Sequence, residues 1–318
     1  MADDAPWVEY EAGAGPGENR HIVLIAGDEE YRSEEALPML ARILSRRHGF
    51  RCTVLFSQDA EGRIDPDARG NIPGLGELET ADLMVLFTRF RELPDKDMRW
   101  IVDYVESGRP FLGIRTATHA FNYTEDSDSR YAHWGWNHPK WKGGFGRHYL
   151  GETWVNHHGH HGSESTRGVI PPGRENHPIL RGVQDVWGPT DVYGIRELPE
   201  DTVVLLEGSV RAGMTPDAPE VDDKRNDPRM PIAWLRERAL VETSRKQRIV
   251  CTTIGAAPDF ASEDLRRLFV NACYWLMRIE DKIPERGDVT LVGEYEPTPF
   301  GFGKFVRGRR PRDHASSN

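Results

Sequence analysis

Short, unbroken runs of apolar residues alternate along the first third of the chain with segments in which apolar residues recur every three or four positions. Four such runs have the length of strands that are covered on both faces: residues 21–27, 51–56, 83–87 and 110–114. Helical spacing follows two of them, from Ser33, a candidate N-cap, to Gly49, and from Asp95 to Gly108. This alternation predicts a parallel α/β sheet with helices on both faces.

The rest of the chain continues the pattern less regularly. We predict further strands at residues 153–155, 202–206, 232–235 and 249–253, and a last helix that Ser262 caps. Residues 212–229 are rich in Pro, Gly and charge and are expected to form an exposed loop. We therefore expect three parts: a loosely ordered arm at residues 1–20, one α/β domain at 21–283, and an extension with a basic tail at 284–318.

Composition narrows the class of protein. The 318 residues include 51 acidic and 41 basic side chains, and the resulting net charge of −10 argues against a nucleic-acid partner. No apolar run approaches the roughly 18–20 residues of a membrane span. The first residues lack the basic and apolar blocks of a signal peptide. We expect a cytoplasmic protein by default, and leave open both export with the signal peptide removed and assembly into a homo-oligomer.

Polar and charged side chains follow the predicted strands where a ligand site is expected. In doubly wound sheets, ligands bind beyond the carboxyl ends of the strands. At these ends, or after a Gly-Pro turn that can reach the same edge, lie Glu30, Tyr31, Arg89, Arg115, Thr116, His119, His157, His158, Asp191 and Tyr193. Any one of them would serve equally well to cap a strand or hold a loop. As a set of carboxylates, guanidiniums and imidazoles, they favour a binding or catalytic site.

The segment at residues 113–117 has the shape of a nucleophile elbow, a sharp turn from strand to helix that presents its central side chain. Here the central residue is Arg115, between Gly113 and Ala117. A guanidinium stays protonated and cannot attack a carbonyl, so hydrolysis through a serine or cysteine at this position is disfavoured. The turn can still direct a cation towards a polarised oxygen.

Residues 133–161, within an insert at about 125–162, contain seven of the twelve histidines and four of the nine tryptophans. Imidazole is the commonest transition-metal ligand and the usual acid–base group near neutral pH. Candidate ligands for a divalent metal such as zinc are His157, His158 and His160, although adjacent strand residues point to opposite faces and the spacing matches no zinc motif. The indoles of Trp134 and Trp136 could cover the apolar face of a sugar. The structural alternative is a loop packed through its tryptophans. Because no GxGxxG follows the first strand, we expect no nucleotide cofactor.

Several motifs, taken in order, resemble the ThuA-like (trehalose utilisation) family: IVLIAGD at residues 22–28, GIRTATHAF at 113–121, NHPILRGV at 176–183 and TTIG at 252–255. The resemblance covers residues 21–277. It implies a flavodoxin-like, doubly wound, mostly parallel sheet of the class I glutamine amidotransferase type, without the glutaminase cysteine. It also implies a role in the metabolism of trehalose or related disaccharides, including 3-keto-glycosides, with a metal such as zinc in some relatives. Many relatives carry His in place of Arg115 and Ala256, so their site residues do not transfer directly.

Two functions remain open at this point. As an enzyme, the chain would act on an oxidised (keto) sugar as a hydrolase, lyase or isomerase, not as a glutamine amidotransferase. Glu30 or His119 would move protons, and Arg89 and Arg115 would polarise a carbonyl or hold a hydroxyl. His157 or His158 would be the second acid–base group or a metal ligand. Substrate-binding candidates are Tyr31, Arg89, Thr116, Trp134, Trp136, Asp191 and Tyr193. Alternatively, the chain is a non-catalytic sugar-binding or assembly module that has lost its nucleophile.

Overall fold

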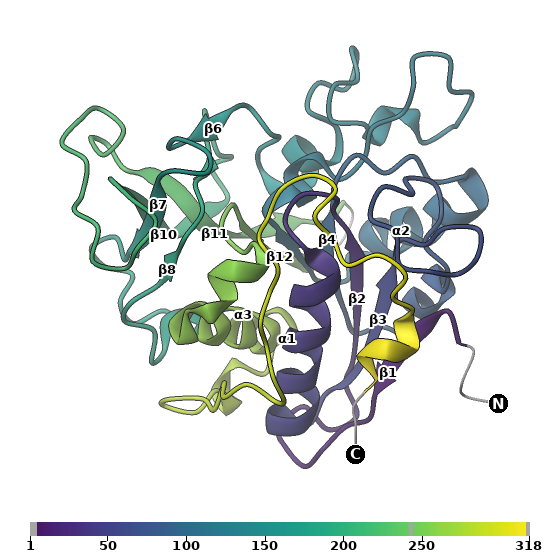
Figure 1. Cartoon of the computed structure of the whole chain (residues 1–318), viewed down its shortest axis with the longest axis horizontal. Coiled ribbons are helices and arrows are strands. Elements are labelled where there is room, and N and C mark those ends of the chain that lie inside the picture. The colour runs from purple at the N-terminus through teal and green to yellow at the C-terminus, as the bar shows by residue number, and fades with distance from the viewer. Residues whose placement is uncertain (1–4, 242–243, 316–318) are drawn as a thin grey trace.

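A ten-stranded sheet forms the centre of the computed structural model, which describes residues 5–241 and 244–315 (Figure 1). The strand order is β1-β3-β2-β4-β5-β12-β11-β10-β7-β8. The strands are β1 (Trp7–Tyr10), β2 (His21–Gly27), β3 (Arg51–Phe56), β4 (Leu83–Thr88), β5 (Phe111–Ile114), β7 (Ser165–Val169), β8 (Trp187–Gly188), β10 (Thr202–Arg211), β11 (Met230–Ala239) and β12 (Lys246–Thr252). A separate two-stranded sheet pairs β6 (His157–His158) with β9 (Val192–Tyr193).

The longer helices are α1 (Ser33–His48), α2 (Asp95–Glu106) and α3 (Glu263–Leu276). Shorter helical turns are η1 (Leu75–Glu79), η2 (Arg115–His119), η3 (Ala132–Trp134), η4 (Gly146–Leu150), η5 (Pro178–Leu180), η6 (Ala257–Ala261), η7 (Glu280–Lys282) and η8 (Pro311–His314). Residues of α1 and α3 share one hydrophobic cluster and residues of α2 belong to the other. The sheet therefore lies between two helical layers, in a mixed α/β architecture.

The strands at the centre of the sheet explain why the sequence folds this way. All seven residues of β2 are buried. Because successive side chains of a strand point to opposite faces, Ile22 and Leu24 pack with α1 and α3, whereas Val23 and Ile25 pack with α2. Burying an aliphatic side chain of this size contributes roughly 1.5–3 kcal/mol relative to exposure. An unbroken apolar run is thus what a strand covered on both faces requires.

The sequence-based predictions hold best in this parallel region. Strands β2 and β3 have the predicted bounds, and β4, β10 and β11 each contain the predicted run; β5 and β12 each omit one end residue of theirs, Pro110 and Thr253. Gly49 ends α1 at φ +77°, a left-handed conformation that favours glycine, and donates to Leu44 O and Ser45 O. Ser262 caps α3 by accepting from the Leu265 backbone N–H. Ser33, expected as an N-cap, is instead the first helical residue and accepts from the Asp28 backbone N–H.

The structure differs from the sequence-based expectations in three places. The N-terminal arm is partly ordered, because Trp7–Tyr10 forms β1 and pairs antiparallel with β3. Residues 153–155 form no strand; the Glu152 carboxylate instead accepts from the Thr153 backbone N–H. The sheet is mixed, since four of its nine neighbouring pairs within the described residues are parallel and five are antiparallel. In the antiparallel half, β10 and β11 were predicted, whereas β7 was missed because it is only partly buried and lacks an apolar run, and β8 was missed because it has only two residues.

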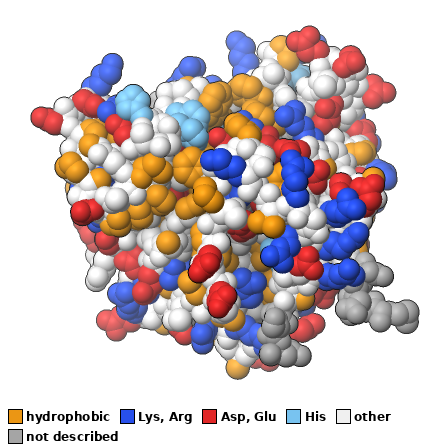
Figure 2. All heavy atoms as spheres, in the orientation of Figure 1, with side chains coloured by type: hydrophobic (Ala, Val, Ile, Leu, Met, Phe, Trp, Pro, Cys, Tyr) orange, Lys and Arg blue, Asp and Glu red, His pale blue; other side chains and the backbone are white. Residues whose placement is uncertain are grey.

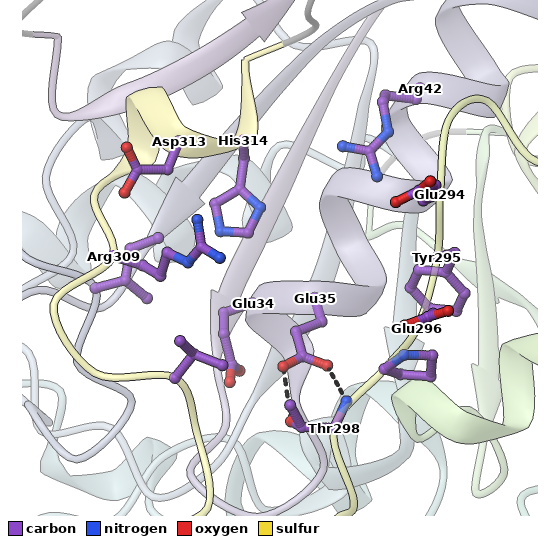
Figure 3. A pocket seen from close by; sticks show the side chains of 13 residues that line it. Glu34, Glu35, Arg42, Glu294, Tyr295, Glu296, Thr298, Arg309, Asp313 and His314 are labelled. Carbon is purple, nitrogen blue, oxygen red and sulfur yellow. Dashed lines mark hydrogen bonds between the residues drawn. The ribbon is translucent and has the colours of Figure 1, made fainter.

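The C-terminal extension returns across α1 and ends beside β1 (Figure 1). Between it and α1 lies a cavity of about 270 Å³ (Figure 3), lined by side chains that include Glu34, Glu35, Arg42, Arg309 and His314. Among the described residues, no helix has the length and apolar character needed to cross a bilayer.

Candidate functional site

The turn between β2 and α1 is held by a buried carboxylate. Asp28 Oδ1 accepts from the backbone N–H groups of Glu30, at 2.8 Å, and of Tyr31. Its Oδ2 accepts from Thr116 Oγ1 at 2.5 Å, which ties this turn to the start of η2. Thr116, a candidate for substrate binding, is itself completely buried and serves this contact. Asp28 therefore fixes the backbone from which Glu30 projects.

A second carboxylate positions the cation at the end of β4. Glu29 accepts from Arg89 Nη1 at 2.5 Å through Oε1 and from Arg91 Nη2 at 3.0 Å through Oε2. Arg91 is completely buried, whereas the side chain of Arg89 is 17% exposed. The Arg89 guanidinium carbon lies 4.4 Å from the centroid of the Phe90 ring and 5.0 Å from that of Phe302. Arg89 is thus held by charge on one side while its guanidinium stays within reach of solvent.

Arg115 occupies the elbow with φ +48°, a strained conformation for a residue that is not glycine. Its side chain is completely buried: Nη1 donates to Thr253 O at 2.9 Å and to Thr190 Oγ1 at 3.2 Å. The guanidinium carbon lies 3.8 Å from the centroid of the Tyr31 ring and 5.1 Å from that of Tyr193. The two rings and Arg115 form one buried stack. The expected elbow is present, but its cation acts on buried groups of the protein.

Asp191 lies at the base of the site and contacts three basic side chains. Its carboxylate is completely buried and lies 2.5 Å from His157 Nδ1, 2.9 Å from His161 Nδ1 and 3.6 Å from Arg115 Nη2. Burial raises the pKa of Asp191, but the hydrogen bonds from the histidines and the charge of Arg115 outweigh it, so the pKa lies below its ordinary value. Asp191 is therefore an anion that two imidazoles and a guanidinium surround.

Glu30 completes the polar cluster on the opposite side of His161. Its Oε1 lies 3.5 Å from His161 Nε2, and its Oε2 lies 3.7 Å from Arg89 Nε. Burial and the neighbouring Asp28 raise the pKa of Glu30, against the lowering effects of Arg89, Arg115 and His161. His161 consequently bridges two carboxylates, one firmly ionised and one with a weakened tendency to ionise.

His119 lies at the end of η2 and is buried. Its ring centroid is 5.5 Å from that of Tyr193 and 5.9 Å from that of Trp154, and His157 also contacts both rings. His119 and His157 are therefore near neighbours at one edge of the sheet. Burial, with the positive charges of Arg89 and Arg115, holds the pKa of His119 well below its usual value, so its imidazole is neutral at physiological pH.

The histidine-rich insert contributes fewer site residues than its composition suggested. On β6, His157 faces Asp191, while His158 faces away, with Nε2 3.0 Å from Arg225 O. His160 is exposed and none of its side-chain nitrogens joins the cluster. Trp134 is buried between Phe145 and Tyr149, with ring centroids 5.5 Å and 5.2 Å away, so this indole fills the core. Trp136 lies at the edge of the site, 5.6 Å from Phe90.

His161 was not among the candidates drawn from the sequence. It follows His157 by four positions, and the turn between them, with Gly159 at φ +101°, returns the chain so that both rings meet Asp191. The sequence signal that could have identified His161 is the presence of histidines on both sides of Gly159. Phe300 was also missed; its ring stacks on Tyr31 at 5.9 Å and meets His161 at 5.2 Å.

The cluster has a donor set that suits a divalent cation. His157, His161 and Asp191 each offer one ligand atom, and these atoms all lie within 4.8 Å of one another. Two imidazoles and a carboxylate are the set from which catalytic zinc sites with an open position are built. The histidine side chains are about one-third exposed, so an ion could enter from solvent. The residues present therefore fit a metal, with His161 in place of the sequence candidates His158 and His160.

Comparisons with known proteins show to which family the chain belongs. Among solved structures, the chain resembles a putative ThuA-like protein from Parabacteroides merdae, with 13% identity and a TM-score of 0.50 over 94% of this chain and 99% of that one. It also resembles a putative ThuA-like protein from Bacteroides uniformis, with 15% identity and a TM-score of 0.48 over 84% of this chain and 95% of that one. No curated protein matches the chain. The profile of the ThuA family, described as trehalose utilisation, matches residues 23–276, and the chain belongs to that family.

Proposed function

We propose that this ThuA-family protein is an enzyme that moves a proton on a carbohydrate next to a carbonyl group, such as that of a 3-keto-glycoside. The observation that carries the proposal is the position of Glu30: a carboxylate with a raised pKa, 3.5 Å from an imidazole that is itself bound to the buried anion Asp191. A base works best when its pKa lies near the working pH, and pairs of carboxylates whose surroundings push their pKa values apart are typical of acid–base sites. The family's association with trehalose utilisation supports a sugar as substrate.

In this mechanism, the ionised Glu30 takes the proton from the carbon beside the carbonyl. The electron pair of that C–H bond moves towards the carbonyl oxygen, where N–H groups of Arg89 and of the histidine pair stabilise the developing charge. In an isomerisation, Glu30 returns the proton to the former carbonyl carbon while the proton of the adjacent hydroxyl group passes to the former carbonyl oxygen. In an elimination, the carbonyl re-forms as the leaving group departs from the next carbon with its bonding electron pair and takes the proton from Glu30. Asp191 orients His157 and His161, and Arg115 keeps Asp191 ionised; both act as positioning residues.

His157, His161 and Asp191 would hold a divalent metal, which supplies a Lewis acid for a carbonyl oxygen when bound. His119 does not suit the role of base that the sequence suggested, because its pKa lies well below its usual value. As a neutral imidazole, it can instead accept or donate a hydrogen bond to a sugar hydroxyl.

The second candidate function is a non-catalytic sugar-binding module. The feature that favours it is the elbow, where the buried Arg115 stands in the position of a nucleophile. It differs from the first in one measurable respect, because a binding module leaves the carbon-bound protons of its ligand in place.

The test is exchange of deuterium from solvent into methyl 3-keto-α-glucopyranoside, followed by NMR. We expect the wild-type protein to catalyse exchange at a carbon next to the carbonyl. Glu30→Gln should lower the rate on the order of 10²-fold or more, as for loss of a general base. Glu18→Gln, which removes an exposed carboxylate, should leave the rate unchanged. Binding of the keto-sugar by wild-type protein without exchange would support the module instead.

A further inference from the structure

The segment at residues 298–302, here called the strap, crosses the candidate site from outside the part of the chain that the family profile matches. It is anchored twice. Glu35 of α1 accepts from the Thr298 backbone N–H at 2.8 Å and from its Oγ1 at 2.7 Å (Figure 3). Gly301 then donates its N–H to Glu30 O at 2.7 Å and accepts from Arg32 Nη2 at 2.9 Å. The strap is therefore bonded to the same turn that carries the proposed base.

The two aromatic residues of the strap lie on either side of this second anchor. Phe300 stacks on Tyr31 and meets the edge of His161, with ring centroids 5.9 Å and 5.2 Å away. Phe302 faces the guanidinium of Arg89 at 5.0 Å. Because His161 and Arg89 contact the two oxygens of Glu30, the strap places one ring beside each partner of that carboxylate.

Phe302 is a large apolar ring that is 60% exposed. The exposed apolar residues in the described part of the chain are too few to make Phe302 part of a docking face for another protein. The only other exposed large hydrophobic residues there are Val241 and Val306. A stable protein interface buries about 800 Å² on each partner, far more than these side chains offer. The exposed ring suits a small ligand with one apolar face.

Further aromatic side chains continue from Phe302 around the polar cluster. Arg89 lies between Phe302 and Phe90, Phe90 contacts Trp136 at 5.6 Å, and Trp136 contacts Trp154 at 5.8 Å. Within the described residues, Trp136 Nε1 is buried and has no hydrogen-bond partner. Figure 2 shows hydrophobic side chains gathered beside histidines on the upper part of one face. Aromatic faces around charged groups match a sugar ring, which has an apolar C–H face and hydroxyl groups at its edge.

We propose that the strap forms part of the substrate site, with Phe302 as a specificity-determining residue that stacks on a pyranose ring while Arg89 binds its hydroxyl groups. Phe300 supports this position by packing against Tyr31 and His161. The inference rests on the proposed function for the class of ligand, and it adds a binding subsite that residues 23–276 alone do not contain.

The experiment measures binding of methyl α-D-glucopyranoside by saturation-transfer NMR, in parallel with the deuterium-exchange assay on the keto-glycoside. We expect Phe302→Ala to weaken binding about tenfold and Phe302→Trp to restore it, as for loss and return of a stacking contact. Val306→Ala, a second exposed apolar residue of the extension, is the matched control and should bind like wild type. Because Phe302 is exposed, its variants should also keep the wild-type Tm.

The outcomes separate the two proposals. Wild-type affinity in Phe302→Ala, or no binding of the glucoside by the wild-type protein, overturns the role of the strap. An unchanged KM of Phe302→Ala in the exchange reaction overturns it as well, while leaving the proposed function intact. If Phe302→Ala weakens binding but the wild-type protein catalyses no exchange, the strap subsite stands and the proposed function fails.

Discussion

Arg115 Nη2 lies 3.6 Å from Asp191 Oδ1, and both side chains are completely buried. This contact joins the elbow after β5 to Asp191, the residue directly before strand β9. Arg115, which stands in the position of a nucleophile, is thus the counter-charge of Asp191. Asp191 in turn orients the two histidines of the site. Removal of Arg115 leaves the buried carboxylate of Asp191 with only the two histidines as partners in this cluster.

We predict that Arg115→Gln destabilises the protein by about 3–5 kcal/mol, the usual cost of breaking a buried ion pair by removing one partner. Urea unfolding monitored by circular dichroism measures the effect. Arg130→Gln is the control, because Arg130 pairs with Asp95 at 3.6 Å on the surface and should contribute less than about 1 kcal/mol. Equal stability of Arg115→Gln and wild type would show that Asp191 does not depend on this cation.

A second prediction concerns the metal. We expect the protein to bind Zn²⁺ stoichiometrically and His161→Ala to lose it, because two ligands remain of the three that lie within 4.8 Å. His160→Ala removes the adjacent exposed histidine and should bind as the wild type does. Elemental analysis after dialysis against zinc, with isothermal titration, provides the measurement. Retention of zinc by His161→Ala would exclude the cluster as the metal site.

A third prediction follows from the cavity beneath the extension. Burial raises the pKa of Glu34 to about 8, against the lowering effect of Arg32, whose Nη1 lies 3.6 Å away. Both carboxyl oxygens of Glu34 lack a hydrogen-bond partner among the described residues, so the neutral form is favoured. A raised folded-state pKa gives stability that is complete below the unfolded value of 4.5 and is lost as pH rises towards 8.

The free energy of unfolding of the wild type should therefore fall more steeply between pH 4.5 and 8 than that of Glu34→Gln, which cannot titrate. Glu296→Gln, which changes an exposed carboxylate at the same cavity, should keep the wild-type slope. Urea unfolding at a series of pH values tests this, and parallel curves for wild type and Glu34→Gln would be the contrary result.

The sequence predicts the parallel strands well because burial on both faces leaves an unbroken apolar run, as in β2 and β3. It also indicates which residues lie at the ends of these strands, and Glu30, Arg89, His119 and His157 do share one edge of the sheet. It does not predict side-chain direction after the strand ends. Arg115 therefore appeared able to contact substrate, although the elbow turns it beneath Tyr31 and Tyr193.

Contacts between distant segments were beyond sequence reasoning for a different reason. Gly301 bonds to the turn at Glu30 across about 270 positions, and no local pattern specifies such a pairing. The position of His161 in the site depends on the turn at Gly159 and on a contact with Asp191, a residue thirty positions away. In both cases the packing of separate loops, and not the propensity of either one, determines the contact.

The backbone bonds of Gly301 have a consequence for the order in which the protein is assembled. During synthesis, the backbone oxygen of Glu30 and the guanidinium of Arg32 can form these hydrogen bonds only after residue 301 has left the ribosome. A fragment cut to residues 23–276 would leave both groups to water and omit two aromatic walls. Expression trials therefore need boundaries drawn beyond the residues that the family profile matches.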